Sequence, residues 1–100
     1  MKRSFRLSRR ANRDVEAVRE WYDKQDAGLG NQFLDDLNAT FSIICERPKS
    51  FPQVKPGIRA TRCSRFPYRI YFEVFADRID ILAVYHTARN PRRWNDPDRE

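Results

Sequence analysis

The chain has 100 residues, of which 40% are hydrophobic and 34% charged, and its net charge is +6. These values fit one small globular domain and exclude a disordered segment. No run approaches the roughly 20 apolar residues of a membrane-spanning helix, and no apolar core of a secretory signal follows the basic N-terminus, so we expect a cytoplasmic protein without membrane contact. Two cysteines and one histidine are too few for a disulfide scaffold or a structural zinc site, and we expect no metal and no cofactor.

The charges are arranged in blocks along the chain. Residues 1–13 carry six positive charges and no negative one, and residues 14–46 carry two positive and eight negative charges. Residues 47–69 carry seven positive charges and no negative one, and residues 70–100 carry five positive and six negative charges. A face that joined the two basic blocks would attract a polyanion or an acidic partner segment. Sixteen of the 20 cations are arginine, which suits bidentate contacts to phosphate or carboxylate, although a merely solvated basic surface is the alternative.

Two amphipathic helices are predicted in the first half of the chain, after a short strand at residues 5–7. Ser8 is placed to cap the first helix. The apolar face of this helix repeats at intervals of four, three and four residues: Ala11, Val15, Val18 and Tyr22. A break at residues 26–30 precedes the second helix, which repeats at intervals of four, four and three residues: Phe33, Leu37, Phe41 and Ile44. It ends before Pro48, because proline disfavours helix in the residue before it, and the short break predicts an antiparallel helical hairpin.

The second half of the chain predicts an antiparallel meander of strands. Residues 48–57 hold three prolines and a glycine and indicate a loop, and residues 58–63 are a plausible strand. Alternating apolar residues predict strands over residues 68–75 and 79–85, joined by a turn so short that they must be antiparallel. By alternation, Ile79, Ile81, Ala83 and Tyr85 face one way and His86 faces the other. The fold class is therefore α+β, with an N-terminal strand and a two-helix hairpin packed on a small antiparallel β-sheet.

In order and spacing, several segments resemble the RelE/ParE superfamily of small bacterial toxins from type II toxin–antitoxin modules. The resemblance runs from about Phe5 to Trp94 and is strongest to the ParE branch. Its carriers are Ala11 and Asp14 in the first helix, Gly28, Phe33 and Leu37 around the second, the stop at Pro48, Arg59 and Arg62, and residues 66–72 and 81–94. The resemblance implies a single toxin domain over residues 1–95, followed by a polar C-terminal tail at residues 96–100.

The resemblance also implies a partner and one of two targets. ParE-like members poison DNA gyrase by stabilising its cleaved-DNA state, whereas RelE-like members cut messenger RNA in the ribosomal A site. Both kinds are neutralised by an antitoxin whose C-terminal segment wraps the toxin. We therefore expect a hetero-oligomer with a cognate antitoxin, with DNA gyrase as the target and the ribosome with its messenger RNA as the alternative.

RNA cleavage requires a base, an acid and cations that stabilise the phosphorane charge. By resemblance, Arg69 and Arg89 match two cations of RelE-like enzymes, but the paired lysines and the C-terminal tyrosine of those enzymes have no counterpart. His86 is the remaining acid–base candidate, because imidazole titrates near neutral pH. A structural or solvent-facing His86 and a surface Arg69 paired with Glu73 are the simpler alternatives. A thiol nucleophile at Cys63 beside His86 lacks an orienting third group.

Without that acid–base set, the ParE-type interpretation assigns no catalytic residue. Its candidates for target contact lie in the basic C-terminal stretch: Arg89, Arg92, Arg93 and Trp94. Its candidates for receiving an acidic antitoxin segment are Arg59, Arg62 and Arg65. A family member that has lost toxicity and only binds its antitoxin is a third possibility.

Overall fold

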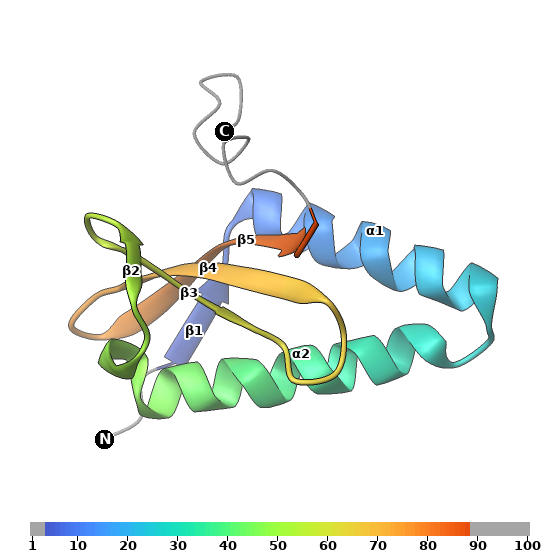
Figure 1. Ribbon diagram of the computed structural model, residues 1–100, viewed down its shortest axis with the longest axis horizontal. Helices are drawn as coiled ribbons and strands as arrows, with labels where there is room; N and C mark the ends of the chain where they lie inside the picture. The colour runs from blue at the N-terminus through green and yellow to red at the C-terminus, as the bar shows by residue number, and fades with distance from the viewer. Residues whose placement is uncertain (1–3, 89–100) are drawn as a thin grey trace.

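Two helices follow an N-terminal strand and precede a four-stranded meander in the computed structural model, which describes residues 4–88 (Figure 1). In chain order the elements are β1 (Ser4–Leu7), α1 (Arg9–Gln25), α2 (Leu29–Glu46), the 3₁₀ turn η1 (Pro48–Ser50), β2 (Gln53–Lys55), β3 (Ile58–Arg62), β4 (Tyr68–Val74) and β5 (Arg78–His86). The predicted α+β class and the predicted order of strand, helical hairpin and meander are confirmed.

The five strands form one sheet in the order β1-β5-β4-β3-β2. The pairs from β3 to β5 are antiparallel, as predicted, and the short strand β2 also pairs antiparallel with β3. β1 instead pairs with β5 in parallel, so that Ser4 aligns with Arg78 and Leu7 with Ile81. The sheet is therefore mixed rather than wholly antiparallel. Parallel pairing is possible here because the helical hairpin and the meander separate the two strands by far more than the dozen residues that a crossover needs.

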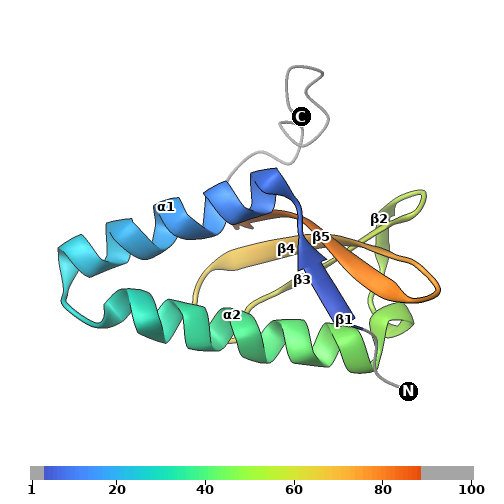
Figure 2. The same ribbon diagram turned by 180° about the vertical axis from the view of Figure 1, so that it is seen from behind.

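The two helices run antiparallel and lie side by side against one face of the sheet (Figures 1 and 2). Their apolar stripes and the facing strand residues make the main core, because a half-buried helix or sheet is stable only when its apolar side is covered. The largest fully buried side chains of this core are Phe33, Leu37, Ile44, Ile70, Phe72, Ile79, Ile81 and Val84.

Side chains of α1 bind backbone groups of β5. Ser8 caps α1 as predicted, since its Oγ accepts the Ala11 N–H at 3.0 Å. The same hydroxyl donates to the Leu82 carbonyl oxygen at 3.0 Å, and the Asp14 carboxylate accepts the Val84 N–H at 3.0 Å. Both backbone groups flank a bulge in the ladder, where they would otherwise lack partners. Ser8 and Asp14 thereby fix α1 against the end of β5.

That bulge, at Leu82, reverses the alternation of β5. Between β4 and β5 the register shifts by one residue at this point. As a result Ile79 and Ile81 pack in the main core, whereas Ala83 and Tyr85 face the opposite side of the sheet. The prediction that these four residues share one face is wrong, because one inserted residue moves every later side chain to the other face.

The proline-rich segment 48–57 is more ordered than its composition indicates. It contains η1 and the short edge strand β2, whose Gln53 pairs with Arg59 of β3. Gly57 supplies the positive φ of +81° at the turn between β2 and β3. Composition alone predicted a loop because prolines are depleted from strand interiors, and here they flank the strand instead.

Two glycines lie where the turn between the helices meets α2. Gly28 precedes α2 with a φ of +89°, in the left-handed region that glycine adopts readily. Gly30 lies where the helices approach most closely, and its N–H donates to Asp23 Oδ1 at 2.9 Å. A Cβ at position 30 would lie only 2.7 Å from the Arg19 carbonyl oxygen and 2.7 Å from Asp23 Oδ1.

Gly30→Ala is therefore expected to lower the free energy of unfolding by about 2 kcal/mol, because the backbone of Arg19 must move to admit the methyl group. Gly28→Asn is the control, since asparagine tolerates the left-handed region and a Cβ at position 28 meets no atom within 4 Å. Urea unfolding of the two variants measures the difference. Equal stability of Gly30→Ala and the parent protein would contradict the close helix approach.

Candidate functional site

The face of the sheet opposite the helices carries a row of paired side chains from three strands. We call it the outer face, and it comprises Ala60 and Arg62 of β3, Arg69 and Tyr71 of β4, and Ala83 and Tyr85 of β5. Arg62 aligns with Arg69, and Arg69 aligns with Tyr85, so these three residues form one cross-strand row. Tyr71 and Tyr85 lie close together, with ring centroids 5.8 Å apart, and both rings are buried.

The charges on the outer face are separated into two ends. At one end Asp80 accepts hydrogen bonds from Arg78 Nε at 3.0 Å and from Arg6 at 3.3 Å. Partial burial would raise the pKa of Asp80, but these two arginines outweigh it, so the pKa lies below its ordinary value. That end is electrostatically paired.

The other end of the outer face is positive, and we call it the arginine end: Arg10, Arg62 and Arg69. The Arg10 guanidinium lies 5.2 Å from the centroid of the Tyr85 ring, which places it beside the row of Arg62 and Arg69. Within residues 4–88, no carboxylate forms an ion pair with any of the three. The expected surface pairing of Arg69 with Glu73 is likewise not formed among these residues.

The three arginines predicted to bind the antitoxin do not share a surface. Arg59 turns away from the outer face and donates to the Phe51 carbonyl oxygen at 2.6 Å. Arg65 lies in the β3–β4 connection, where its guanidinium approaches Gln32 of α2 at 3.5 Å. Only Arg62 lies on the outer face, since neighbouring strand positions alternate between faces.

Of the three residues proposed for RNA cleavage, the two that the structure describes, His86 and Arg69, are not brought together. His86 aligns with Tyr68 and lies on the helix side of the sheet, whereas Arg69 lies on the outer face. The two side chains are therefore separated by the sheet. Arg89, together with the other target-contact candidates Arg92, Arg93 and Trp94, lies outside the residues that the structure describes.

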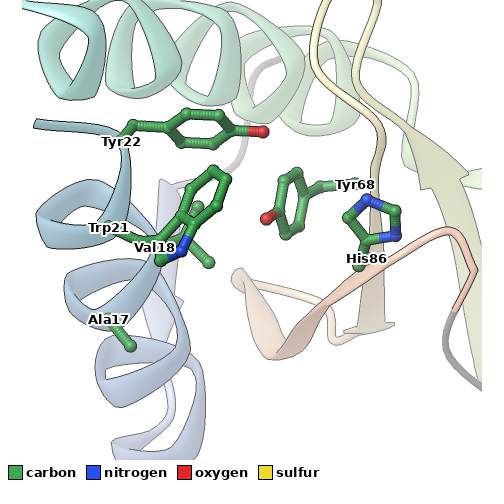
Figure 3. A pocket seen from close by; sticks show the side chains of 6 residues that line it. All are labelled: Ala17, Val18, Trp21, Tyr22, Tyr68 and His86. Atoms are coloured by element: carbon green, nitrogen blue, oxygen red, sulfur yellow. The ribbon is translucent and has the colours of Figure 1, made fainter. Parts of the chain in front are cut away.

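His86 lines a groove between α1 and the end of the sheet. The groove is formed by Ala17, Val18, Trp21 and Tyr22 of α1 with Tyr68 and His86 (Figure 3). Figure 3 shows the Trp21 and Tyr22 rings projecting from α1 toward Tyr68, with His86 beside Tyr68. The His86 and Tyr68 rings meet edge to face with centroids 5.2 Å apart, and the Ala88 N–H donates to His86 Nδ1 at 3.0 Å. Trp21 is 56% exposed, which marks the groove as an apolar surface available to a partner.

A buried carboxylate, which the sequence did not single out, holds the connection between β3 and β4. Asp36 of α2 accepts the Phe66 N–H at 2.8 Å, the Arg65 N–H at 3.0 Å and the Ser64 hydroxyl at 2.9 Å. Burial would raise the pKa of Asp36, but these hydrogen bonds outweigh it and hold the pKa below its ordinary value. The sequence offers one signal for this role, because Asp36 lies next to Leu37 on the apolar stripe of a helix. A charge buried at such a position requires hydrogen-bond donors.

The cysteines offer no reactive centre in the described part of the chain. Cys45 and Cys63 are both buried, and they form no disulfide with each other. Burial raises the pKa of the Cys63 thiol to about 11, so the thiolate nucleophile is scarce at neutral pH. Residues 4–88 contain no group of three side chains arranged to hold a metal ion, and no helix among them is long and apolar enough to cross a bilayer.

The chain is similar in sequence to a known protein family and in fold to a solved structure. Residues 5–91 match the family model described as the ParE toxin of the type II toxin–antitoxin system parDE. The chain is also similar to a solved structure described as the chromosomal ParDE TA system from P. aeruginosa, at 20% sequence identity and a TM-score of 0.74. That match covers 85% of this chain and 96% of the other, and at this identity it establishes the shared fold alone. No curated protein sequence matches significantly.

Proposed function

Because the chain belongs to the family of ParE toxins of type II toxin–antitoxin systems, we propose that it poisons DNA gyrase and is neutralised by a cognate antitoxin. The toxin stabilises the cleaved-DNA state of gyrase as a binding inhibitor and is not itself a catalyst. The toxin domain spans residues 1–95, and residues 96–100 are a polar tail. Target contact is assigned to Arg89, Arg92, Arg93 and Trp94.

The separation of His86 from Arg69 is the observation that favours gyrase poisoning over RNA cleavage. General acid–base catalysis requires the proton-transfer group within hydrogen-bond reach of the same substrate that the cation binds. Here the sheet lies between the imidazole and the Arg69 guanidinium. His86 Nδ1 also already accepts the Ala88 N–H, which gives this histidine a structural role at the end of β5.

A supercoiling and cleavage assay with purified gyrase tests the proposal. Linear plasmid, released by protease treatment only when both toxin and gyrase are present, is the expected result. Unchanged supercoiling by protein that circular dichroism shows to be folded would contradict it. The same preparation is then added to a translation reaction, where cleavage of messenger RNA in the A site would identify the RelE-type activity instead. Silence in both assays would leave a protein that only binds its antitoxin.

The antitoxin partner is proposed to cover the groove of Trp21, Tyr22 and Tyr68 or the positive surface around Arg62, since Trp21 is an exposed apolar side chain beside a groove and Arg62 is an exposed basic one. Co-expression with the product of the neighbouring open reading frame is expected to give a stable complex on size exclusion. A toxin that elutes as a monomer in the presence of that product would contradict the partnership.

A further inference from the structure

The arginine end of the outer face contains a costly arrangement. Arg62 and Arg69 are directly opposite each other on neighbouring strands. Directly opposed residues have Cβ atoms about 5 Å apart, and like charges in that position destabilise a sheet. No carboxylate among residues 4–88 relieves the repulsion, although Asp80 shows that the same face accommodates paired arginines elsewhere.

Arg10 adds a third guanidinium and an unsatisfied donor. Its Nε atom is buried and has no hydrogen-bond partner among residues 4–88, while its guanidinium carbon lies 5.2 Å from the centroid of the Tyr85 ring. A buried donor without a partner costs free energy, and such groups in native proteins require an explanation. An anion bound at the pair of Arg62 and Arg69 would relieve their repulsion, and the Arg10 guanidinium over Tyr85, the residue paired with Arg69, would add to the positive potential that attracts it.

The shape of the arginine end favours a polyanionic backbone over an acidic peptide. Ala60, Tyr71, Ala83 and Tyr85 are each no more than 6% exposed, so these four side chains offer a peptide almost no apolar surface. A bound peptide gains specificity from side-chain pockets, whereas phosphodiester contacts require only positioned donors. Arginine, with its planar fork of donors, is well suited to phosphate.

We propose that Arg10, Arg62 and Arg69 form a binding site for the phosphodiester backbone of DNA, and that in the cell this is the DNA held by gyrase. The assignment to gyrase-bound DNA rests on the proposed function, whereas binding of free DNA does not. The site requires no base contact and gives no sequence specificity, because its donors reach only backbone phosphates. The toxin would thus hold the enzyme and its DNA at the same time.

The experiment measures binding of the purified toxin to a fluorescein-labelled DNA duplex by anisotropy between 50 and about 200 mM salt, the range over which phosphate contacts lose affinity steeply. The test variant is Arg62→Gln/Arg69→Gln. The control variant, Arg47→Gln/Lys49→Gln, removes the same charge from exposed residues at the end of α2 and in η1, on the helix side of the sheet. The test variant is expected to reduce the slope of log affinity against log salt by about 2, and the control is expected to change it much less.

The test variant is expected to remain folded. Removing two opposed like charges should leave the melting temperature unchanged or higher, and this is checked first. Equal losses in the test and control variants would overturn the site and leave only a general effect of net charge. A loss on labelled RNA but not on DNA would overturn the assignment to DNA. Tighter, Arg62-dependent binding to polyglutamate than to the duplex would overturn it in favour of an acidic peptide.

The gyrase assay separates this site from the proposed function. If toxin and gyrase together give linear plasmid, Arg62→Gln/Arg69→Gln is expected to require at least several-fold more toxin for the same yield. If the parent toxin leaves gyrase unaffected while binding of free duplex still depends on Arg62 and Arg69, the proposed function fails and the phosphodiester site stands.

Discussion

Replacing Asp36 with alanine is expected to lower the free energy of unfolding by about 3 kcal/mol or more, because two backbone N–H groups and one hydroxyl lose their common acceptor. The Arg65 and Phe66 N–H groups are only partly buried, so water replaces some of the lost hydrogen bonding and limits the effect. The connection between β3 and β4 would then be held to α2 by packing and by the 3.5 Å contact between Arg65 and Gln32. Urea unfolding followed by circular dichroism measures the change.

The same carboxylate makes stability depend on pH in the acidic range. Its pKa is lowered in the folded protein, so its contribution is fully present above the ordinary aspartate pKa of about 4 and is lost as the pH falls through the folded value. Asp36→Asn keeps the shape of the side chain but removes this ionisation. The free energy of unfolding of Asp36→Asn should therefore fall less steeply than that of the parent between about pH 5 and pH 2.

Asp35 provides a matched control for both measurements. It is the adjacent residue of α2, it is exposed, and its side chain makes no hydrogen bond or ion pair within residues 4–88. Asp35→Ala is expected to change stability by no more than about 0.5 kcal/mol, as is usual for surface substitutions. If Asp35→Ala and Asp36→Ala were equally destabilising, the loss would reflect the helix charge and not the hydrogen bonds to the β3–β4 connection.

Local sequence patterns predict the helices and strands, but they do not predict on which side of the sheet each side chain of β5 lies. Spacings of three and four residues predict both helices, and the Ser8 cap and Pro48 stop predict their bounds closely, because these effects act within one or two turns. The bulge at Leu82 depends on how β5 pairs with β4 and on acceptors and donors from α1, far away in sequence. A period of two residues carries no information about one inserted residue.

The candidate site was predictable in its charge and not in its geometry. The basic block at residues 47–69 indicated an anionic partner, but Arg59 and Arg62 are three residues apart on a strand and so face opposite sides of the sheet. Arg10, Arg62 and Arg69 come from three elements: the strand register aligns Arg62 with Arg69, and the contact of Arg10 with Tyr85 adds the third. Asp36 likewise depends on donors about thirty residues away, which no local pattern reveals.

Replacing the C-terminal cluster with Arg89→Gln, Arg92→Gln, Arg93→Gln and Trp94→Ala is expected to weaken gyrase poisoning by about 30-fold or more, as removal of arginine and tryptophan anchors does at protein interfaces. These residues come shortly after β5 in the sequence. The end of β5 is held by the bond from the Ala88 N–H to His86 Nδ1 and by the bond from the Thr87 N–H to the Pro67 carbonyl oxygen at 2.9 Å. Two bonds therefore hold residues 86–88, the last described part of the chain. The measurement is the toxin concentration that gives half-maximal linear plasmid.

Charge alone must be separated from contact in this experiment. Lys24→Gln/Arg47→Gln/Lys49→Gln removes three positive charges from exposed positions on the helical side and leaves the C-terminal cluster intact. If the cluster contacts gyrase, this control retains most of the poisoning and the cluster variant does not, although both have the same net charge. Equal losses would instead mean that gyrase, or its DNA, attracts the toxin through its overall +6 charge. In that event the salt dependence of poisoning should be steep and alike in both variants, whereas a specific Trp94 contact persists at high salt because apolar burial is not screened.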